Sequence, residues 1–336
     1  MQTIRAREDY LDYLKAFAGI LVVIGHAFRY LGDIQGEISF PNRLAQLLIY
    51  SVHVPLYFVI AGFLCRKKPV LPFYQAKFQR IIIPYFTFCI LKLIYSAFIS
   101  NEFAHASNLV NVLFDAFFIG RLYWFAYCIF LTFLLAPLFW DETHEKRIFI
   151  ALGCLCILDA LVIFYPLPEE ITVANERISN PFYQISNLLN FFHFFLIGLL
   201  VRNHKSALSS PLQRKRFLLS LAFVAVAFLS FLIMRGTIKQ TVFTKTCLAF
   251  CLMYPLFLIA KALPKRLTIL SQLGQYSLQI MFFDSFYKTL LFKIAARFVE
   301  LNMITALFIC ALNIALTYVA CTVIRKIPYV RILFGL

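Results

Sequence analysis

The chain has 336 residues, of which 62% are hydrophobic and 14% charged, and its mean hydropathy is +0.80. Soluble domains carry roughly 25% charged residues, so this chain has too little polar surface for a water-soluble particle and is predicted to be an integral membrane protein. Its 32 Lys and Arg outweigh 16 Asp and Glu. Because the basic residues form short loop clusters, we interpret them as cytoplasmic loop charge that also helps to hold an anionic ligand, and not as a nucleic-acid surface.

Apolar runs of about 20 residues, the length that crosses a bilayer, predict ten transmembrane helices. They lie at 11–31, 45–65, 81–100, 122–140, 147–165, 188–202, 216–235, 242–262, 272–292 and 303–324. The segment 108–118 is too short to cross and is expected to lie at the interface or to re-enter the membrane. The first run lacks a small-residue cleavage site, so it is interpreted as a retained helix and not as a signal peptide.

The basic residues also predict the orientation. With the N-terminus inside, the outer loops hold about half as many Lys and Arg as the inner loops. Both termini are therefore expected in the cytoplasm. The predicted fold class is an all-α bundle of about ten transmembrane helices, with residues 1–336 forming a single domain. The nine cysteines lie almost entirely within apolar runs and form no C-x-x-C pair, so neither a disulfide nor a metal site is predicted.

The first predicted helix contains three ionisable residues, Asp12, Lys15 and His26. Lys15 and His26 are eleven residues apart, which puts them on one helix face, about 16 Å apart along the axis. Lys15 then lies near the cytoplasmic end and His26 in the outer half. Structural roles explain each residue separately: Lys15 reaches the headgroups or pairs with Asp12, and His26 bonds to a neighbour. Together they indicate a functional stripe that links a cation to a buried base.

The second and third predicted helices add further polar residues. His53 is expected at a depth near that of His26, so the two imidazoles can approach each other. Lys77 and Arg80 stand three residues apart at the cytoplasmic start of the third helix and are expected to share a face. The pair is explained either as positive-inside anchoring or as a clamp for phosphates.

Polar and aromatic residues in two later segments also have two interpretations each. Arg121, Tyr123 and Trp124 open the fourth helix at the outer surface, either as part of an aromatic belt or as a platform for a sugar ring. Asp284 in the ninth helix is a costly charge in mid-membrane. It is either a structural partner of Lys288, one turn on, or the carboxylate that orients His26 or His53.

Four segments, in order, resemble the membrane acyltransferase family 3, bacterial proteins that O-acylate cell-surface polysaccharides. They are LDYLKAFAGILVVIGH (11–26), PLYFVIAGF (55–63), KFQRIIIPY (77–85) and RLYWF (121–125). The ten-helix count agrees, so the resemblance covers essentially the whole chain. Three positions depart from the family pattern. Lys15 stands where Arg is common, Ala61 where a small polar residue is frequent, and Asp284 where the ninth-helix motif often ends in His.

The resemblance implies transfer of an acyl group, most often acetyl, from cytoplasmic acyl-CoA to a glycan hydroxyl at the bacterial inner membrane. The expected catalytic residues are His26, Lys15 and Asp284; the donor-binding residues Lys15, Lys77 and Arg80; and the acceptor-binding residues His53, Arg121, Tyr123 and Trp124. His26 is the expected base, because imidazole titrates near neutral pH. The alternative is an exporter or flippase of a polysaccharide or lipid-linked sugar, against which stands the lack of paired Gly- or Pro-broken helices. A sensor or scaffold would leave His26 unexplained.

Overall fold

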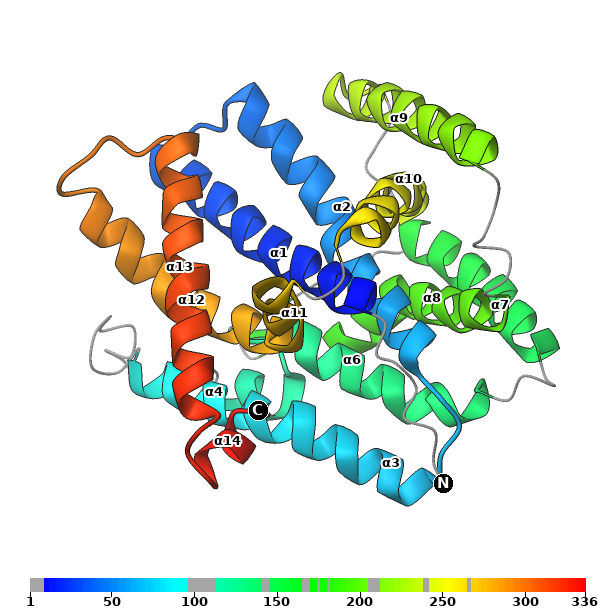
Figure 1. Cartoon of the computed structure of the whole chain (residues 1–336), viewed down its shortest axis with the longest axis horizontal. Coiled ribbons are helices and arrows are strands. Elements are labelled where there is room, and N and C mark those ends of the chain that lie inside the picture. Colours follow the sequence, from blue (N-terminus) through cyan, green and yellow to red (C-terminus); the bar gives the residue numbers. More distant parts are fainter. Residues whose placement is uncertain are drawn as a thin grey trace. The chain divides into compact units, whose positions relative to one another are not determined.

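The computed structural model describes residues 9–95, 113–140, 145–164, 170–173, 176–180, 182–204, 212–237, 242–264 and 267–336. These residues are almost entirely helical (Figure 1). Among the described residues, two short strands, β1 (Glu170–Val173) and β2 (Glu176–Ser179), pair in an antiparallel sheet. It falls in the loop predicted between the fifth and sixth membrane helices.

Within the described residues a helix lies at each of the ten predicted positions, whereas residues 96–100 of the third predicted helix and residue 165 of the fifth lie outside the described part. In chain order the elements are α1 (Asp9–Gln35), α2 (Phe40–Leu64), α3 (Val70–Lys77), the π-helical turn η1 (Phe78–Ile82), α4 (Ile83–Tyr95), the π-helical turn η3 (Asp115–Ile119), α6 (Trp124–Leu135), the 3-10 turn η4 (Ala136–Leu138), α7 (Glu145–Phe164), α8 (Tyr183–Asn203), α9 (Leu212–Met234), α10 (Val242–Ala262), α11 (Thr268–Gln275), α12 (Ser277–Ala295), α13 (Met303–Ile324) and α14 (Val330–Leu333).

Seven helices of the described chain are long and apolar enough to cross a membrane. They are Asp9–Gln35, Phe40–Leu64, Val70–Tyr95, Asp115–Leu138, Tyr183–Asn203, Thr244–Ala262 and Met303–Ile324. The protein is therefore a multi-pass helical membrane protein, whereas the count of ten crossings stays a prediction. α12 is not among these seven helices, and it carries three charged residues, Asp284, Lys288 and Lys293, along its length.

Two predicted helices differ in detail from those in the structure. The third begins at Val70, eleven residues before the predicted start, and passes through a π-helical turn. The ninth is interrupted at Tyr276, which separates α11 from α12. In the segment 108–118, residues 108–112 lie outside the described residues, and 113–118 belong to a helical stretch that ends at Gly120 with φ 74°.

The chain divides into two compact units. The first unit comprises Met1–Ile60 and Lys205–Cys321, and the second comprises Ala61–His204 and Thr322–Leu336. In the first unit α1 contacts α10, α11 and α12, and α9 packs on α10. In the second unit α8 contacts α6 and α7, and α14 contacts α4. A single domain over residues 1–336 stays a prediction.

Two glycines allow the tightest helix contacts within the units. A Cβ on Gly274 of α11 would overlap the backbone oxygen of Asp12 in α1, and a Cβ on Gly62 of α2 would overlap that of Phe195 in α8. Small residues let helix backbones approach closely in membrane proteins. Gly62 lies in the PLYFVIAGF segment, so part of that motif has a packing role.

The apolar core of the first unit surrounds the middle of α1. Its fully or nearly buried members from α1, α12 and α13 are Ala16, Val23, Ala27, Phe28, Leu31, Ile280, Phe292, Ala306, Ile309 and Cys310. α12 and α13 contribute to this core from sequence positions more than 200 residues after α1. A buried polar side chain on the inner face of one of these helices therefore needs a hydrogen-bond partner on its own or a neighbouring helix.

Candidate functional site

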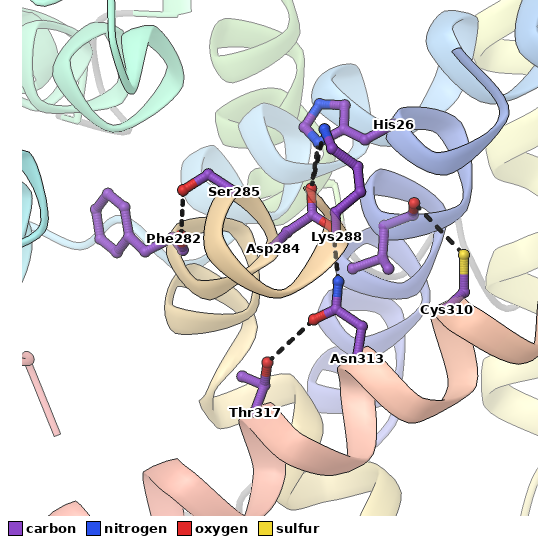
Figure 2. A network of polar contacts seen from close by, with 9 residues as sticks. His26, Phe282, Asp284, Ser285, Lys288, Cys310, Asn313 and Thr317 are labelled. Carbon is purple, nitrogen blue, oxygen red and sulfur yellow. Dashed lines mark hydrogen bonds and ion pairs between the residues drawn. The ribbon is translucent and has the colours of Figure 1, made fainter. Parts of the chain in front are cut away.

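His26 and Asp284 form a direct polar contact in the first unit. His26 Nδ1 lies 2.7 Å from Asp284 Oδ2, with the imidazole on α1 and the carboxylate on α12 (Figure 2). The His26 side chain is 37% exposed and the Asp284 side chain 1%. An ionised carboxylate can only accept hydrogen bonds, so Nδ1 is the nitrogen that carries the proton. In the neutral ring Nε2 is then unprotonated and able to act as a base.

Asp284 has two further partners. Asn313 of α13 donates from Nδ2 to Asp284 Oδ1 at 2.8 Å, and Lys288 Nζ lies 4.0 Å from Oδ2. Thr317 in turn donates to Asn313 Oδ1 at 3.5 Å (Figure 2). Both contacts considered for Asp284 from the sequence are therefore present. The imidazole is the closer partner, and Lys288 stands at the limit of an ion pair.

His53 has a different environment. It is 4% exposed, and its Nδ1 lies 2.6 Å from the backbone oxygen of Ile49, which makes Nδ1 the donor. The ring of Tyr50 contacts both histidines, with centroids 6.4 Å from His26 and 5.1 Å from His53. The two imidazoles thus lie in one neighbourhood, as expected, but the carboxylate of Asp284 is hydrogen-bonded to His26.

The residue before His26 allows α2 to come this close. A Cβ on Gly25 would stand 2.8 Å from a side-chain carbon of Ile49 and 3.6 Å from the ring of Tyr50. The first of these distances is not tolerated between carbon atoms, so a larger residue would require the Ile49 side chain or α2 itself to shift. Gly25 therefore allows α2, with Ile49 and Tyr50, to lie close to α1 beside His26.

Lys15 lies on the same continuous helix as His26, as the eleven-residue spacing requires. Its Nζ is 2.6 Å from Asp12 Oδ1, and Ser271 donates to Asp12 Oδ2 at 3.4 Å. The Lys15 side chain remains 23% exposed. The pairing with Asp12, considered from the sequence as a structural role, is thus present. An anion that binds Lys15 therefore competes with the carboxylate of Asp12 for the ammonium group.

Lys77 and Arg80 belong to the second unit and are not equivalent. Lys77 Nζ lies 3.5 Å from the ring centroid of Phe133 and 5.5 Å from that of Phe73, whereas Arg80 is exposed. The π-helical turn η1 begins directly after Lys77, so the α-helical i, i+3 geometry expected for the pair does not hold there. Arg80 is the more accessible of the two cations.

Arg121, Tyr123 and Trp124 lie in a cluster of aromatic rings in the second unit. The contacts are Arg121 to Tyr183 (5.9 Å), Tyr123 to Tyr85 (6.4 Å) and Trp124 to Phe191 (5.5 Å, stacked). One face of the Trp124 indole is therefore occupied by Phe191. A sugar ring could stack only on the other face.

A polar cluster joins helix ends in the second unit. Asn203 donates to Glu145 Oε1 at 3.0 Å, His204 Nε2 lies 3.4 Å from Glu145 Oε2, and Arg202 donates to the backbone oxygen of Cys65. The hydrogen bond from Asn203, with the nearby His204, lowers the pKa of Glu145 below its usual value. These contacts connect the ends of α2 and α8 to the start of α7, and they involve none of the predicted site residues.

Asn313 is a site residue that the sequence analysis missed. It is 1% exposed and contacts Asp284 directly. The signal was present, because Asn313 is the only amide or charged side chain in the apolar run 303–324. A buried amide in such a run is expected to bond to another polar group.

Comparison with known protein families identifies the chain. Residues 8–322 match the family model of acyltransferase family 3, described as an acyltransferase domain. No curated protein and no solved structure matches the chain. The match includes both His26 and Asp284 and leaves out only the first seven and last fourteen residues. The chain therefore belongs to acyltransferase family 3 and is a multi-pass membrane acyltransferase.

Proposed function

We propose that the protein transfers an acyl group, with acetyl as the proposed group, from cytoplasmic acyl-CoA to a hydroxyl of a cell-surface or lipid-linked glycan. The observation that carries the proposal is the 2.7 Å contact between His26 Nδ1 and the buried carboxylate of Asp284. It supplies an oriented base inside a membrane acyltransferase. We also propose that residues 1–336 form one domain in a bacterial inner membrane, with about ten crossings and both termini in the cytoplasm, in line with the basic inner loops.

In the proposed reaction His26 is the general base. An alcohol is a weak nucleophile at neutral pH, so the acceptor hydroxyl gives its proton to His26 Nε2 as its oxygen attacks the thioester carbonyl carbon. Asp284 holds the Nδ1 proton and stabilises the imidazolium that forms. When the C–S bond breaks, the proton passes from His26 to the leaving thiolate. The products are the glycan ester and free coenzyme A, and no metal takes part.

The donor is proposed to bind through cations. Lys15 lies about three helical turns from His26 on one helix, about 16 Å along the axis, a span similar to that of a pantetheine arm. Because Asp12 already pairs with Lys15, most of the attraction for donor phosphates falls to Arg80, with Lys77 in support.

The acceptor is proposed to contact His53, Arg121, Tyr123 and Trp124. His53 uses Nδ1 for the Ile49 carbonyl, which leaves Nε2 as an acceptor for a glycan hydroxyl. Arg121 and Tyr123 offer polar atoms, and the face of Trp124 not covered by Phe191 offers a stacking surface.

The test is an acyl-transfer assay with protein in lipid nanodiscs, labelled acetyl-CoA and surface glycan, together with mass analysis of glycans from cells with and without the gene. We expect a labelled ester with the wild type. His26→Ala should lower the rate by about 10²- to 10⁴-fold, the usual contribution of a general base, at an unchanged level of membrane-inserted protein. Normal ester formation by His26→Ala would refute the assignment of His26, and an unchanged glycan in cells lacking the gene would refute the acceptor.

A further inference from the structure

The amide of Asn313 contacts the oxygen of Asp284 that His26 does not use. Asn313 Nδ2 donates to Oδ1 at 2.8 Å, while Oδ2 faces His26 Nδ1 at 2.7 Å. Both Asp284 and Asn313 are 1% exposed. The two contacts come from different helices, α13 and α1, so together they determine how the carboxylate is rotated on α12 (Figure 2).

The orientation of this amide follows from its two neighbours. An amide presents either its NH₂ group or its carbonyl oxygen, and only NH₂ can face a carboxylate without repulsion. On the other side Thr317 Oγ1 lies 3.5 Å from Asn313 Oδ1 and donates to it. The direction of donation therefore runs from Thr317 to Asn313 and on to Asp284. Such a chain stabilises the ionised form of the carboxylate.

We infer that Asn313 is a positioning residue of the acyl-transfer reaction, which holds Asp284 ionised and turned toward His26. The inference rests on the proposed role of His26 as the base. Asn313 itself contacts no reacting atom in this scheme. Its effect reaches the substrate through Asp284 and then through the imidazole, so it should change how the histidine titrates.

Other groups also act on the pair. Within the described residues, the titratable and charged groups around it are Lys288 of α12, Cys310 of α13, and Tyr50 and His53 of α2, with Arg29 and Asp33 acting on Tyr50. None of them is replaced in the test below. Lys288, the nearest cation, stands 4.0 Å from Asp284 Oδ2, so it keeps part of the stabilisation when Asn313 is replaced.

The direction of the expected effect follows from charge. In the unprotonated pair the buried negative charge of Asp284 depends on its hydrogen-bond donors, whereas protonation of the pair neutralises that charge. Loss of the Asn313 donor therefore destabilises the unprotonated pair more, and the pair takes up its proton at a higher pH. Activity that requires neutral His26 is then lost at a higher pH as the solution is acidified.

The experiment compares Asn313→Leu and Asn313→Asp with the wild type, using Ser285→Ala as the matched control. Ser285 is next to Asp284 on α12, but its hydroxyl donates to the Phe282 backbone oxygen at 3.0 Å. We expect the acidic limb of the kcat/KM profile to move up by about one pH unit in Asn313→Leu. It should move further in Asn313→Asp, which adds a second acid, and stay in place in Ser285→Ala. KM for acetyl-CoA should stay within about twofold.

A second measurement separates this inference from the proposed function. The ring of His26 is titrated by NMR in the same folded, monodisperse samples, with His26→Ala used to assign its signal. An upward shift of the His26 pKa in Asn313→Leu supports the inference. This outcome does not depend on the activity assay, in which a wild type that is inactive on acetyl-CoA would refute the proposed function. An unchanged His26 titration, or a pure loss of kcat with no movement of the pH profile, would overturn the inference while leaving His26 as the base.

Discussion

The predicted site residues of the two units have different kinds of partner. In the first unit His26 contacts an acid 258 positions away in the sequence, and that acid contacts an amide on a third helix. In the second unit Lys77 and Arg121 lie over the rings of Phe133 and Tyr183. An aromatic face attracts a cation without fixing its donors, whereas a buried carboxylate requires directed donors. The first arrangement suits proton transfer at a defined atom, and the second suits adjustable binding of ligands.

The largest effect that tests this contrast is expected at Asp284. Asp284→Asn keeps the shape of the side chain but removes its charge, so it should lower kcat by about 10²- to 10⁴-fold. Lys288→Ala, which removes the more distant partner at 4.0 Å, should change kcat by less than about threefold. Steady-state rates with protein level measured on the same membranes provide the comparison. The orienting role is wrong if Asp284→Asn is fully active or fails only because the folded protein is lost.

An intermediate effect is expected at the cations of the second unit. Arg80→Ala should raise KM for acetyl-CoA by about tenfold with kcat nearly unchanged, because a phosphate contact far from the reacting carbon contributes uniform binding. Lys77→Ala should raise it less, since its amine lies against the ring of Phe133. Lys92→Ala, near the other end of the same helical stretch, is the control. A defect confined to kcat would contradict the phosphate clamp.

The smallest effect is expected at Trp124. Trp124→Phe keeps an aromatic ring against Phe191, so KM for the glycan should rise by less than about threefold, and Trp124→Leu should raise it by up to about tenfold. Saturation curves for the acceptor at fixed acetyl-CoA measure both. A loss of kcat as large as that of Asp284→Asn would show that this cluster takes part in the chemistry, and the contrast between the units would then fail.

The sequence by itself determined the class of the protein, the presence of a helix at each of the ten predicted positions and the placement of Lys15 and His26 on one helix. These features depend on hydropathy and on the helical period, which are local properties of the chain. The start of the third helix was predicted wrongly. That helix begins at Val70 and contains a π-helical turn, which hydropathy and the helical period do not predict.

Only the tertiary structure decided which residues meet. The sequence left open whether Asp284 pairs with Lys288, His26 or His53, and packing of α12 on α1 selected His26 as the closest partner. Asn313 belongs to the site because the tertiary structure brings α13 to α12, where its amide contacts Asp284. Helix periodicity specifies the face on which a residue lies, but the rotation and height of one helix against another depend on side-chain packing across the whole unit, which is non-local.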